Sequence, residues 1–411
     1  MERTENSTGL CPTVVDLFCG AGGLSLGLFR AGFSIVAAVD NWSPAVETYR
    51  LNFSDHIVCA DIFEDIEIPY AEVIVGGPPC QGFSSAGLRR SDDQRNTLVR
   101  VFGRIVQRLR PMAFVFENVE GFLTGSHGKF VFDLLEPVIE AGYRVHVRKV
   151  NAANYGVPQH RKRVIAVGGL GWDPTFAEVT HSAFGAPGAR LGGTHLPKTP
   201  SLGEALTGLP TAAPRGTMGA SPDHTFYPLR EDDLARAKLL KPGQRMRDLP
   251  EALWHPSYRR RAYRRVMDGM PTERRGGAPA GLRRLSLHEP CKAITGGALN
   301  EFLHPTEDRP LTLRECARLQ TFPDDFKFAG TLREAIQLAG NAVPPLLAQK
   351  LAENLRRDME TVDVGGLPGA LLSFLPTLST GMSPALRSVE KAVAERFSNH
   401  VSTVQACFPW D

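Results

Sequence analysis

A single cysteine directly after two prolines could act as a nucleophile. The apolar run at residues 72–75 is typical of a buried strand, and the turn at residues 76–80 that follows it reads Gly-Gly-Pro-Pro-Cys. The prolines restrict the backbone immediately before Cys80, and a polar, glycine-bearing stretch continues to Arg95. A thiolate on a rigid turn, next to a segment that could close over a substrate, indicates covalent catalysis. A buried structural cysteine is the alternative interpretation.

One carboxylate and two guanidinium groups border other apolar runs. Glu117 follows the run at residues 112–116, which predicts a position at the carboxyl edge of a sheet, where active sites of α/β folds gather. Arg161 and Arg163 precede the run at residues 164–167, and residues two apart on a strand share one face. Two guanidinium groups on one face suit a carboxylate, a phosphate or a base carbonyl. A solvated basic strand end is the alternative.

The N-terminal part has the pattern of a nucleotide-cofactor site. A strand predicted at residues 13–18 leads into a glycine-rich turn at 19–23 and then into a helix. This turn by itself is compatible with NAD, FAD or S-adenosylmethionine. Asp40 ends the next predicted strand, where an acid suits a ribose hydroxyl pair. Asp61 ends the third, where it could accept a hydrogen bond from an adenine amino group or could simply cap a loop.

A doubly wound α/β sheet is the fold class that would position these groups. Strands and helices alternate along the first 170 residues and give a pattern of six or seven strands. The predicted strands are 13–18, 34–39, 58–62, 73–75, 112–116, 143–150 and 164–167, and the helices are 24–31, 44–51, 100–109 and 130–141. Later, capping boxes at Thr312 and Thr331 predict two helices, and a turn at 340–345 precedes a long helix to about Met359. The tail contains one amphipathic helix candidate at 383–397.

The composition excludes several classes of protein. The 411 residues are 42% hydrophobic and 22% charged, which is ordinary for a globular protein. We find no run long enough to span a membrane and no signal-peptide pattern at the polar start. The seven cysteines are scattered, odd in number and without a Cys-x-x-Cys pair. This usage favours a reducing compartment over a disulfide framework or a zinc site.

Positive charge is concentrated in the middle of the chain. Residues 172–292 contain 19 Lys and Arg against 12 Asp and Glu, a net charge of +7, whereas the rest of the chain has 28 against 32, a net charge of −4. Glycine, proline and arginine clusters are dense in this region, and aromatic residues lie among them. We therefore expect an irregular module with a basic surface for a polyanionic partner, with a solvated basic face as the alternative.

Six blocks of this sequence, in the usual order, resemble the DNA cytosine-C5 methyltransferase family. The resemblance covers residues 12–358, with a variable middle. The blocks are Asp16-Leu-Phe-Cys-Gly-Ala-Gly-Gly23, Pro78-Pro-Cys-Gln81, Glu117-Asn-Val119, Gln159-x-Arg-x-Arg163, Arg314-Glu-Cys-Ala-Arg-Leu-Gln-Thr-Phe-Pro323 and Gly340-Asn-Ala-Val-Pro-Pro345. The resemblance implies the Rossmann-like fold of S-adenosylmethionine-dependent methyltransferases and methyl transfer to C5 of cytosine in duplex DNA.

The resemblance also implies a role for each site residue. Cys80 would add to C6 of a flipped cytosine, Glu117 would hydrogen-bond N3 and the exocyclic amine, and Arg163 would hold O2 with support from Arg161. Loss of the C5 proton after methylation would release Cys80. The residues implied for the cofactor pocket are Phe18, Gly20, Gly22, Gly23, Asp40, Asp61, Ile62, Pro79 and Asn341. Asn41 departs from the family pattern, because many relatives have an adenine-stacking aromatic there, and neighbouring Trp42 is a candidate substitute.

The expected organisation follows from the same resemblance. Residues 12–170 and 293–358 would form the catalytic and cofactor-binding domain, residues 171–292 the target-recognition domain, and residues 361–411 a tail without an assigned role. The expected partner is double-stranded DNA, and the expected oligomeric state is a monomer. A cognate restriction endonuclease of the same restriction–modification system is a further candidate partner. We expect a cytoplasmic protein that associates with the nucleoid through DNA.

Three other functions are compatible with parts of this sequence. A methyltransferase acting on exocyclic amino groups needs no cysteine nucleophile and typically has an Asn-Pro-Pro-aromatic tetrad, whereas Cys80 follows Pro-Pro here. The tRNA-methylating branch of the family has a much smaller basic insert and a Cys-Phe-Thr run, and neither is found. An inactive DNA-binding relative would be expected to lose Cys80 or Glu117, and both are present.

Overall fold

Alternating apolar residues on consecutive strands build a central sheet with two buried faces. The computed structural model describes residues 11–63, 66–79, 97–186, 195–256, 258–259, 281–362, 366–378 and 381–397. Its main sheet has eight strands in the order β14-β6-β8-β5-β4-β1-β2-β3. They are β1 (Thr13–Leu17), β2 (Ser34–Asp40), β3 (Ile57–Cys59), β4 (Val73–Gly76), β5 (Ala113–Asn118), β6 (Tyr143–Asn151), β8 (Lys162–Leu170) and β14 (Ala370–Leu375). Only β8 runs antiparallel to its neighbours in this sheet.

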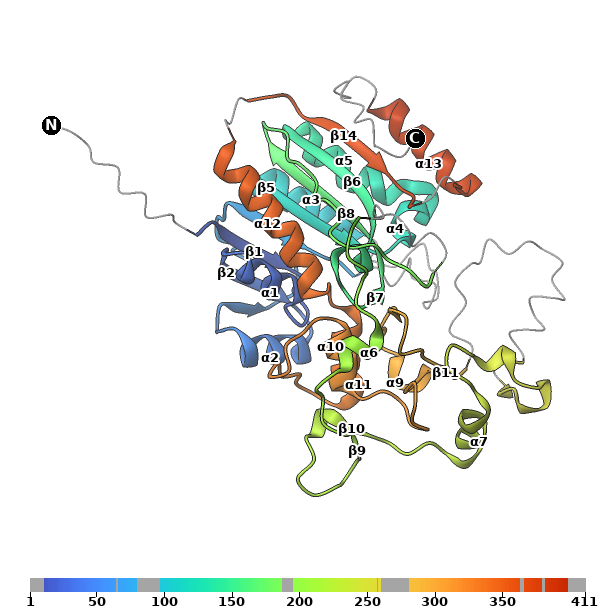
Figure 1. Cartoon of the computed structure of the whole chain (residues 1–411). Helices are drawn as coiled ribbons and strands as arrows, with labels where there is room; N and C mark the ends of the chain where they lie inside the picture. The colour runs from blue at the N-terminus through green and yellow to red at the C-terminus, as the bar shows by residue number, and fades with distance from the viewer. Residues whose placement is uncertain are drawn as a thin grey trace.

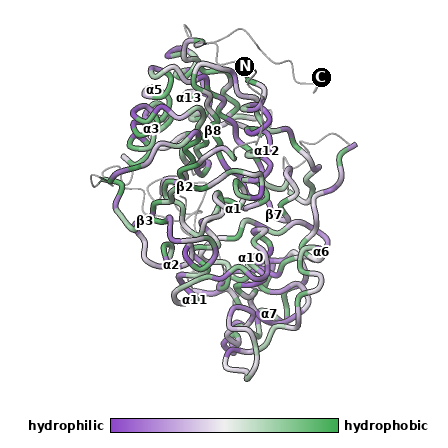
Figure 2. Tube along the Cα trace, turned by 90° about the vertical axis from the view of Figure 1, so that its left-hand side faces the viewer, coloured by the Kyte–Doolittle hydropathy of each residue, from purple (hydrophilic) through white to green (hydrophobic). Residues whose placement is uncertain are grey.

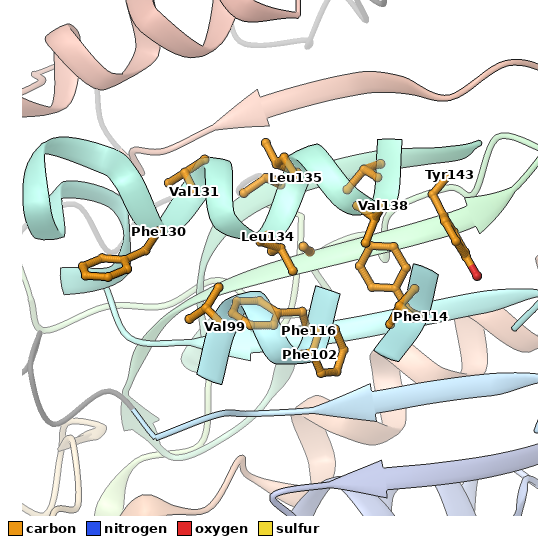
Figure 3. Packing of buried hydrophobic residues seen from close by; sticks show 14 of the residues in the cluster. Val99, Phe102, Phe114, Phe116, Phe130, Val131, Leu134, Leu135, Val138 and Tyr143 are labelled. Carbon is orange, nitrogen blue, oxygen red and sulfur yellow. The ribbon is translucent and has the colours of Figure 1, made fainter. Parts of the chain in front are cut away.

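Helices cover both faces of the sheet (Figure 2). On β5, Ala113 and Val115 join the apolar cluster of one face, which includes α1 (Gly23–Arg30) and α12 (Pro345–Thr361). Phe114 and Phe116 point to the opposite cluster, which includes α3 (Leu98–Leu109) and α5 (Lys129–Glu140). Figure 3 shows Phe102 of α3 between these two rings, with ring centroids 6.2 Å and 5.4 Å away. The period of two along each strand therefore produces the three layers.

The remaining elements form a second part, which lies below the sheet in Figure 1. They are α6 (Leu202–Leu206), β9 (Ala213–Pro214), η4 (Pro222–His224), β10 (Thr225–Phe226), α7 (Glu231–Leu239), η5 (Met246–Asp248), η6 (Glu251–Leu253), β11 (Arg283–Arg284), α9 (Ala298–Glu301), β13 (Phe302–Leu303), α10 (Leu313–Leu319) and α11 (Leu332–Asn341). Two further strands, β7 (Gln159–His160) and β12 (Cys291–Lys292), pair with each other. Leu202 and Leu285 pack with α10 and α11 in one cluster, so hydrophobic packing crosses the boundary predicted at 292/293. That domain boundary stays a prediction.

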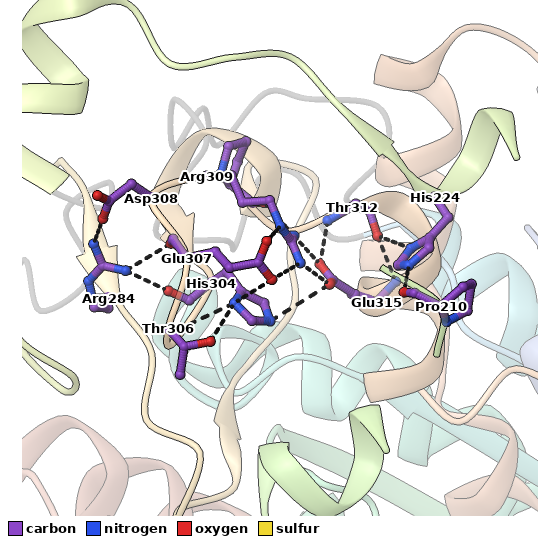
Figure 4. A network of polar contacts seen from close by, with 11 residues as sticks. Pro210, His224, Arg284, His304, Thr306, Glu307, Asp308, Arg309, Thr312 and Glu315 are labelled. Carbon is purple, nitrogen blue, oxygen red and sulfur yellow. Dashed lines mark hydrogen bonds and ion pairs between the residues drawn. The ribbon is translucent and has the colours of Figure 1, made fainter. Parts of the chain in front are cut away.

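A buried polar network holds the second part together (Figure 4). Arg309 pairs with Glu315 at 2.8 Å, and both side chains are 4% exposed. Arg284 donates to the carbonyl oxygens of Leu240 and Ala237 at 2.7 Å and pairs with Asp308. Arg284, although it belongs to one of the arginine clusters of the sequence, is therefore not part of the expected basic surface, because its guanidinium satisfies buried carbonyl groups.

Most of the predicted elements are confirmed, with shifted ends. The capping boxes at Thr312 and Thr331 are formed, and they open α10 and α11 as predicted. The third strand is shorter than predicted, since β3 ends at Cys59 and Asp61 lies beyond it. The pattern of six or seven strands missed β14, whereas the tail helix is present as α13 (Pro384–Arg396). No helix in the described ranges is long and apolar enough to cross a membrane.

The other short elements connect the sheet to its helices. These are α2 (Ser43–Asn52), α4 (Gly121–Thr124), η2 (Gly125–Gly128) and η3 (Ala152–Tyr155). The segment α4–η2 directly follows the end of β5, where Glu117 lies, and it leads into α5.

Candidate functional site

The carboxyl ends of the central strands open into one cleft of about 2820 Å³. Because β1, β2, β4 and β5 are parallel, the residues that follow them meet at the same edge of the sheet. The cleft is lined by most of the predicted site residues, namely Phe18, Gly20, Gly23, Asp40, Asp61, Ile62, Pro79, Glu117, Arg161, Arg163 and Asn341. Gly22 does not line it. Cys80 lies outside the described residues, directly after Pro79 of the cleft wall.

The glycine-rich turn after β1 fits a nucleotide cofactor. Gly20 has φ +56°, and a Cβ added there would meet no described atom within 4 Å, so a ligand can approach the backbone. The Gly20 N–H donates to Asp40 Oδ2 at 2.9 Å, and the Trp42 N–H donates to Oδ1 at 2.9 Å. These bonds fix the orientation of the Asp40 carboxylate at the cleft. Burial raises the pKa of Asp40 above its usual range, and the two backbone donors oppose that shift.

The other two glycines of this turn serve packing. Gly22 has φ +80° at the start of α1, and a Cβ there would overlap the Phe53 ring. A Cβ at Gly23 would overlap the Val343 carbonyl oxygen. Glycine at 22 therefore permits the close approach of Phe53, and glycine at 23 permits that of the 340–345 segment.

Three aromatic residues line the cleft that contains Asp40 and Asp61, namely Phe18, Trp42 and Phe63. Asn41 is exposed, and its Nδ2 lies 3.5 Å from Asp61 Oδ2. Trp42 lines the cleft but is partly buried against the cluster that contains Phe322 and Phe326. Phe63 also lines the cleft and is 53% exposed. Phe18 is the third, held at φ +59°.

A buried chain of hydroxyl groups beneath the turn was missed by the sequence analysis. Ser25 Oγ donates to Asp16 Oδ2 at 2.7 Å, Tyr49 OH donates to Ser25 Oγ at 2.9 Å, and His56 Nε2 lies 3.0 Å from Tyr49 OH. Asp16 is completely buried, and this burial raises its pKa to about 7. The chain links β1, α1 and α2 below the cofactor side of the cleft.

Glu117 lies beside the turn that carries Cys80. A Cβ at Gly77 would be 2.9 Å from Glu117 Oε2, and Asn118 Nδ2 donates to the Pro78 carbonyl oxygen at 3.2 Å. Glu117 Oε1 is 2.7 Å from Arg163 Nε, and both side chains are nearly buried. Although the charges are close, Oε1 has no aligned hydrogen-bond donor among the described residues. The carboxylate therefore faces Arg163 with Oε1 and the turn before Cys80 with Oε2.

Arg161 and Arg163 serve different parts of the structure. Arg161 precedes β8 and is 1% exposed, and its guanidinium donates to the carbonyl oxygens of Ile294, Gly340 and Ala342 at 2.8–2.9 Å. Arg163 is on β8 and contacts Glu117. The expected pair of arginines on one strand is not formed, because Arg161 lies between β7 and β8 and its guanidinium binds backbone carbonyl groups. It positions the segment that contains Asn341.

The comparisons with known proteins agree with this geometry. The family model described as C-5 cytosine-specific DNA methylase matches residues 12–357. The chain belongs to the C-5 cytosine-specific DNA methylases. It is 35% identical over 354 residues to Type II methyltransferase M1.HphI of Haemophilus parahaemolyticus, covering 83% of this chain and 86% of that protein. It is 31% identical to M.AgeI of Thalassovita gelatinovora, covering 83% and 98%.

Solved structures support the fold of this methylase. A DNA modification methyltransferase encoded within an E. coli prophage covers 85% of this chain with a TM-score of 0.61 and 24% identity, and 99% of that chain is matched. The S. pombe Dnmt2 methyltransferase covers 85% with a TM-score of 0.51 and 15% identity, again with 99% of that chain matched. These likenesses concern the fold.

The family assignment establishes the reaction. The protein is a sequence-specific DNA methyltransferase that transfers a methyl group from S-adenosylmethionine to C5 of cytosine. Its DNA-binding and cofactor-binding properties follow from this assignment.

Proposed function

We propose that Cys80 is the nucleophile of this methylase and that Glu117 activates the target cytosine. The supporting observation is the placement of the nearly buried Glu117 carboxyl group: a Cβ on Gly77, in the turn before Cys80, would lie 2.9 Å from its Oε2, and its Oε1 is 2.7 Å from Arg163 Nε. A carboxyl group in this position can accept a hydrogen bond from the exocyclic amine of a flipped cytosine and, when protonated, donate to N3.

The proposed reaction requires two steps from the protein's own residues, addition of a thiolate and transfer of a proton. Cytosine C5 is a poor nucleophile, so the Cys80 thiolate adds to C6 while Glu117 donates a proton to N3 and neutralises the ring. The electron pair then resides at C5. S-adenosylmethionine, when bound, supplies the methyl group that C5 takes. A base removes the C5 proton, the C5–C6 double bond re-forms, Cys80 leaves as a thiolate, and N3 returns its proton to Glu117. None of these atoms is accessible in a stacked duplex, so the base must be flipped out.

The remaining residues hold the two ligands. Arg163 lies beside Glu117 and is placed to hold the cytosine O2 atom. Arg161 supports the site through the 340–342 segment. For the cofactor, Asp40 binds the ribose hydroxyls and Asp61 the adenine amino group. Phe18, Gly20, Ile62, Pro79 and Asn341 line the same side of the cleft, Gly22 and Gly23 shape the turn, and Phe63 and Trp42 offer aromatic faces in place of Asn41.

The biological role is modification within a Type II restriction–modification system. Several relatives carry the Type II methyltransferase name. Residues 171–292 select the cytosine, and residues 12–170 with 293–358 perform the transfer. The protein acts as a monomer on nucleoid DNA in the cytoplasm, with a cognate endonuclease that cleaves the unmodified site.

The decisive experiment uses DNA in which 5-fluorocytosine replaces the target cytosine. Fluorine cannot leave C5 as a cation, so the reaction should add Cys80, transfer the methyl group and then stop, leaving protein bonded to DNA. The adduct should survive denaturing electrophoresis and should require S-adenosylmethionine. It should be absent with Cys80→Ser and unchanged with Cys11→Ser, which alters an exposed cysteine far from the turn. Normal methylation of ordinary DNA without cross-linking to the fluorinated form would contradict the proposed mechanism.

A further inference from the structure

The C-terminal segment at residues 366–378 and 381–397 lies beyond the family match, which ends at residue 357. It nevertheless folds onto the catalytic sheet. Strand β14 pairs in parallel with β6, from Ala370 opposite Arg144 to Leu375 opposite Arg148, and Ser373 Oγ lies 2.7 Å from His146 Nδ1. Figure 1 shows β14 along the edge of the sheet, with α13 beyond it over the end of α4. The segment is thus an integral edge of the methylase sheet.

Helix α13 packs on the segment that follows Glu117. Its residues Leu386, Val389, Val393 and Phe397 belong to the same apolar cluster as α5 and the sheet. A Cβ on Gly128 would lie 2.7 Å from Val389 Cγ2, so α13 approaches the backbone of η2 directly. At its other end, Phe397 stacks on Phe132 with ring centroids 6.2 Å apart.

The backbone under α13 is strained. Ser126 and His127 have φ values of +45° and +56°, and both residues carry side chains. Consecutive left-handed residues other than glycine persist only where the surrounding structure enforces them. Gly128, the residue after His127, has φ +86°, and Val389 packs against it. Helix α13 therefore packs against this turn, as α4 and α5 also do.

The strained turn and the C-terminal segment form one wall of the catalytic cleft. Both side chains of the turn, Ser126 and His127, are exposed and line it. Met382, Ser383 and Ser388 of the C-terminal segment line the same cleft as Glu117 and Arg163. Lys162 lines the cleft as well, whereas the charge of Lys149 is paired with that of Glu120. A wall of small polar groups, an imidazole and a lysine suits the sugar–phosphate backbone of a DNA strand.

We propose that β14 and α13 form a DNA-positioning element: α13 holds the turn at 125–128 so that His127 and Ser126 contact the backbone of the strand carrying the target cytosine. The inference rests on the placement of that cytosine beside Glu117. It adds a role for a segment that the family match does not include. The methyl-transfer step itself is unaffected by this contact, so its loss should be seen as weaker DNA binding.

The first test undocks the helix. Val389→Asp places a carboxylate in the apolar contact with η2, and Ala394→Asp places the same group on the exposed face of α13 as the control. We expect Val389→Asp to raise the KM for DNA roughly tenfold, with the KM for S-adenosylmethionine and kcat within about twofold of wild type. Ala394→Asp should match wild type. An unchanged KM for DNA in folded Val389→Asp overturns the inference.

Two further variants separate positioning from folding. Glycine adopts positive φ without strain, so Ser126→Gly in the Val389→Asp background should recover part of the DNA affinity. His127→Ala changes an exposed side chain and keeps the fold, and it should raise the KM for DNA by a similar factor. An unchanged KM for DNA in His127→Ala overturns the inference, even if Val389→Asp fails to fold. The 5-fluorocytosine adduct at saturating DNA should form in all of these variants, and its absence in wild type would instead count against the Cys80 mechanism.

Discussion

At the scale of single residues, two buried acids near the cleft serve different purposes according to what they contact. Glu117 and Asp16 are both buried. Glu117 lies 2.7 Å from Arg163 and lines the cleft, whereas Asp16 accepts a hydrogen bond from Ser25 beneath the glycine-rich turn. The first arrangement suits chemistry and the second supports the glycine-rich turn.

The pH dependence of stability should reveal Asp16. Its pKa is about 7 in the folded state against 3.8 for the ordinary side chain, so the folded protein retains a proton that the unfolded chain releases between these values. Stability from this group is present at low pH and is lost as pH rises toward 7, by about 1.4 kcal/mol per pH unit and a few kcal/mol in total. We expect Asp16→Asn to remove this component of the slope in urea unfolding between pH 4 and pH 9.

An exposed aspartate provides the control for that measurement. Asp55 is 95% exposed, and Asp55→Asn should leave the slope as in wild type. If Asp16→Asn and wild type have parallel profiles across the range, Asp16 is ionised in the folded protein and the interpretation of its burial is wrong.

At the scale of elements, buried side chains connect segments that are far apart in sequence. Gln159 Nε2 donates to the Leu319 carbonyl oxygen at 2.8 Å, and the Ile294 N–H donates to Gln159 Oε1 at 3.0 Å. Arg161 adds the bonds to residues 340–342. The β7–β8 region therefore anchors the 294 and 340–345 segments against the sheet, and with them Asn341 at the cleft.

Arg161→Ala should damage this anchor. At least three buried carbonyl groups would lose a charged donor, and each such loss costs about 1–3 kcal/mol. We expect a fall of several kcal/mol in the free energy of unfolding, measured by urea denaturation, and weaker cofactor binding by calorimetry. Arg50→Ala, which removes an exposed ion pair with Asp55, should cost less than about 1 kcal/mol. Equal effects of the two variants would show that Arg161 is not an anchor.

At the scale of the whole molecule, the basic region divides into buried and surface arginines. Arg284 is buried in the polar network of the second part, whereas Arg259 lies at its surface with Glu251. Arg260 and Arg261 of the same cluster lie outside the described residues. Arginines that cluster in the sequence therefore have different roles, some at the surface and others buried within the protein.

Replacement of Arg259, Arg260 and Arg261 by alanine should weaken DNA binding and flatten its salt dependence. Each lost phosphate contact should reduce the slope of log K against log salt concentration by about 0.9. Fluorescence anisotropy with target DNA over a range of salt concentrations measures this slope. The contrasting variant Arg284→Ala should lower thermal stability instead. A salt slope equal to that of wild type would mean that the cluster is a solvated face.

The sequence by itself determined the structural features that depend on residues close together in the chain. Strand periodicity, the glycine-rich turn, the capping boxes at Thr312 and Thr331, and the acids after the strands follow from local stereochemistry and a repeat of two or 3.6 residues. The parallel sheet then brings the predicted residues to one edge, so Asp40, Asp61 and Glu117 were identifiable before the cleft was known.

Only the tertiary structure decided which groups are buried and what they contact. The separate roles of Arg161 and Arg163, the burial of Arg284, and the pairing of β14 with β6 join residues up to about 230 positions apart. Local patterns carry no information about such contacts, because they are set by the packing of distant elements. Burial then determines whether an arginine binds carbonyl groups or DNA, since a buried guanidinium must satisfy its donors within the protein.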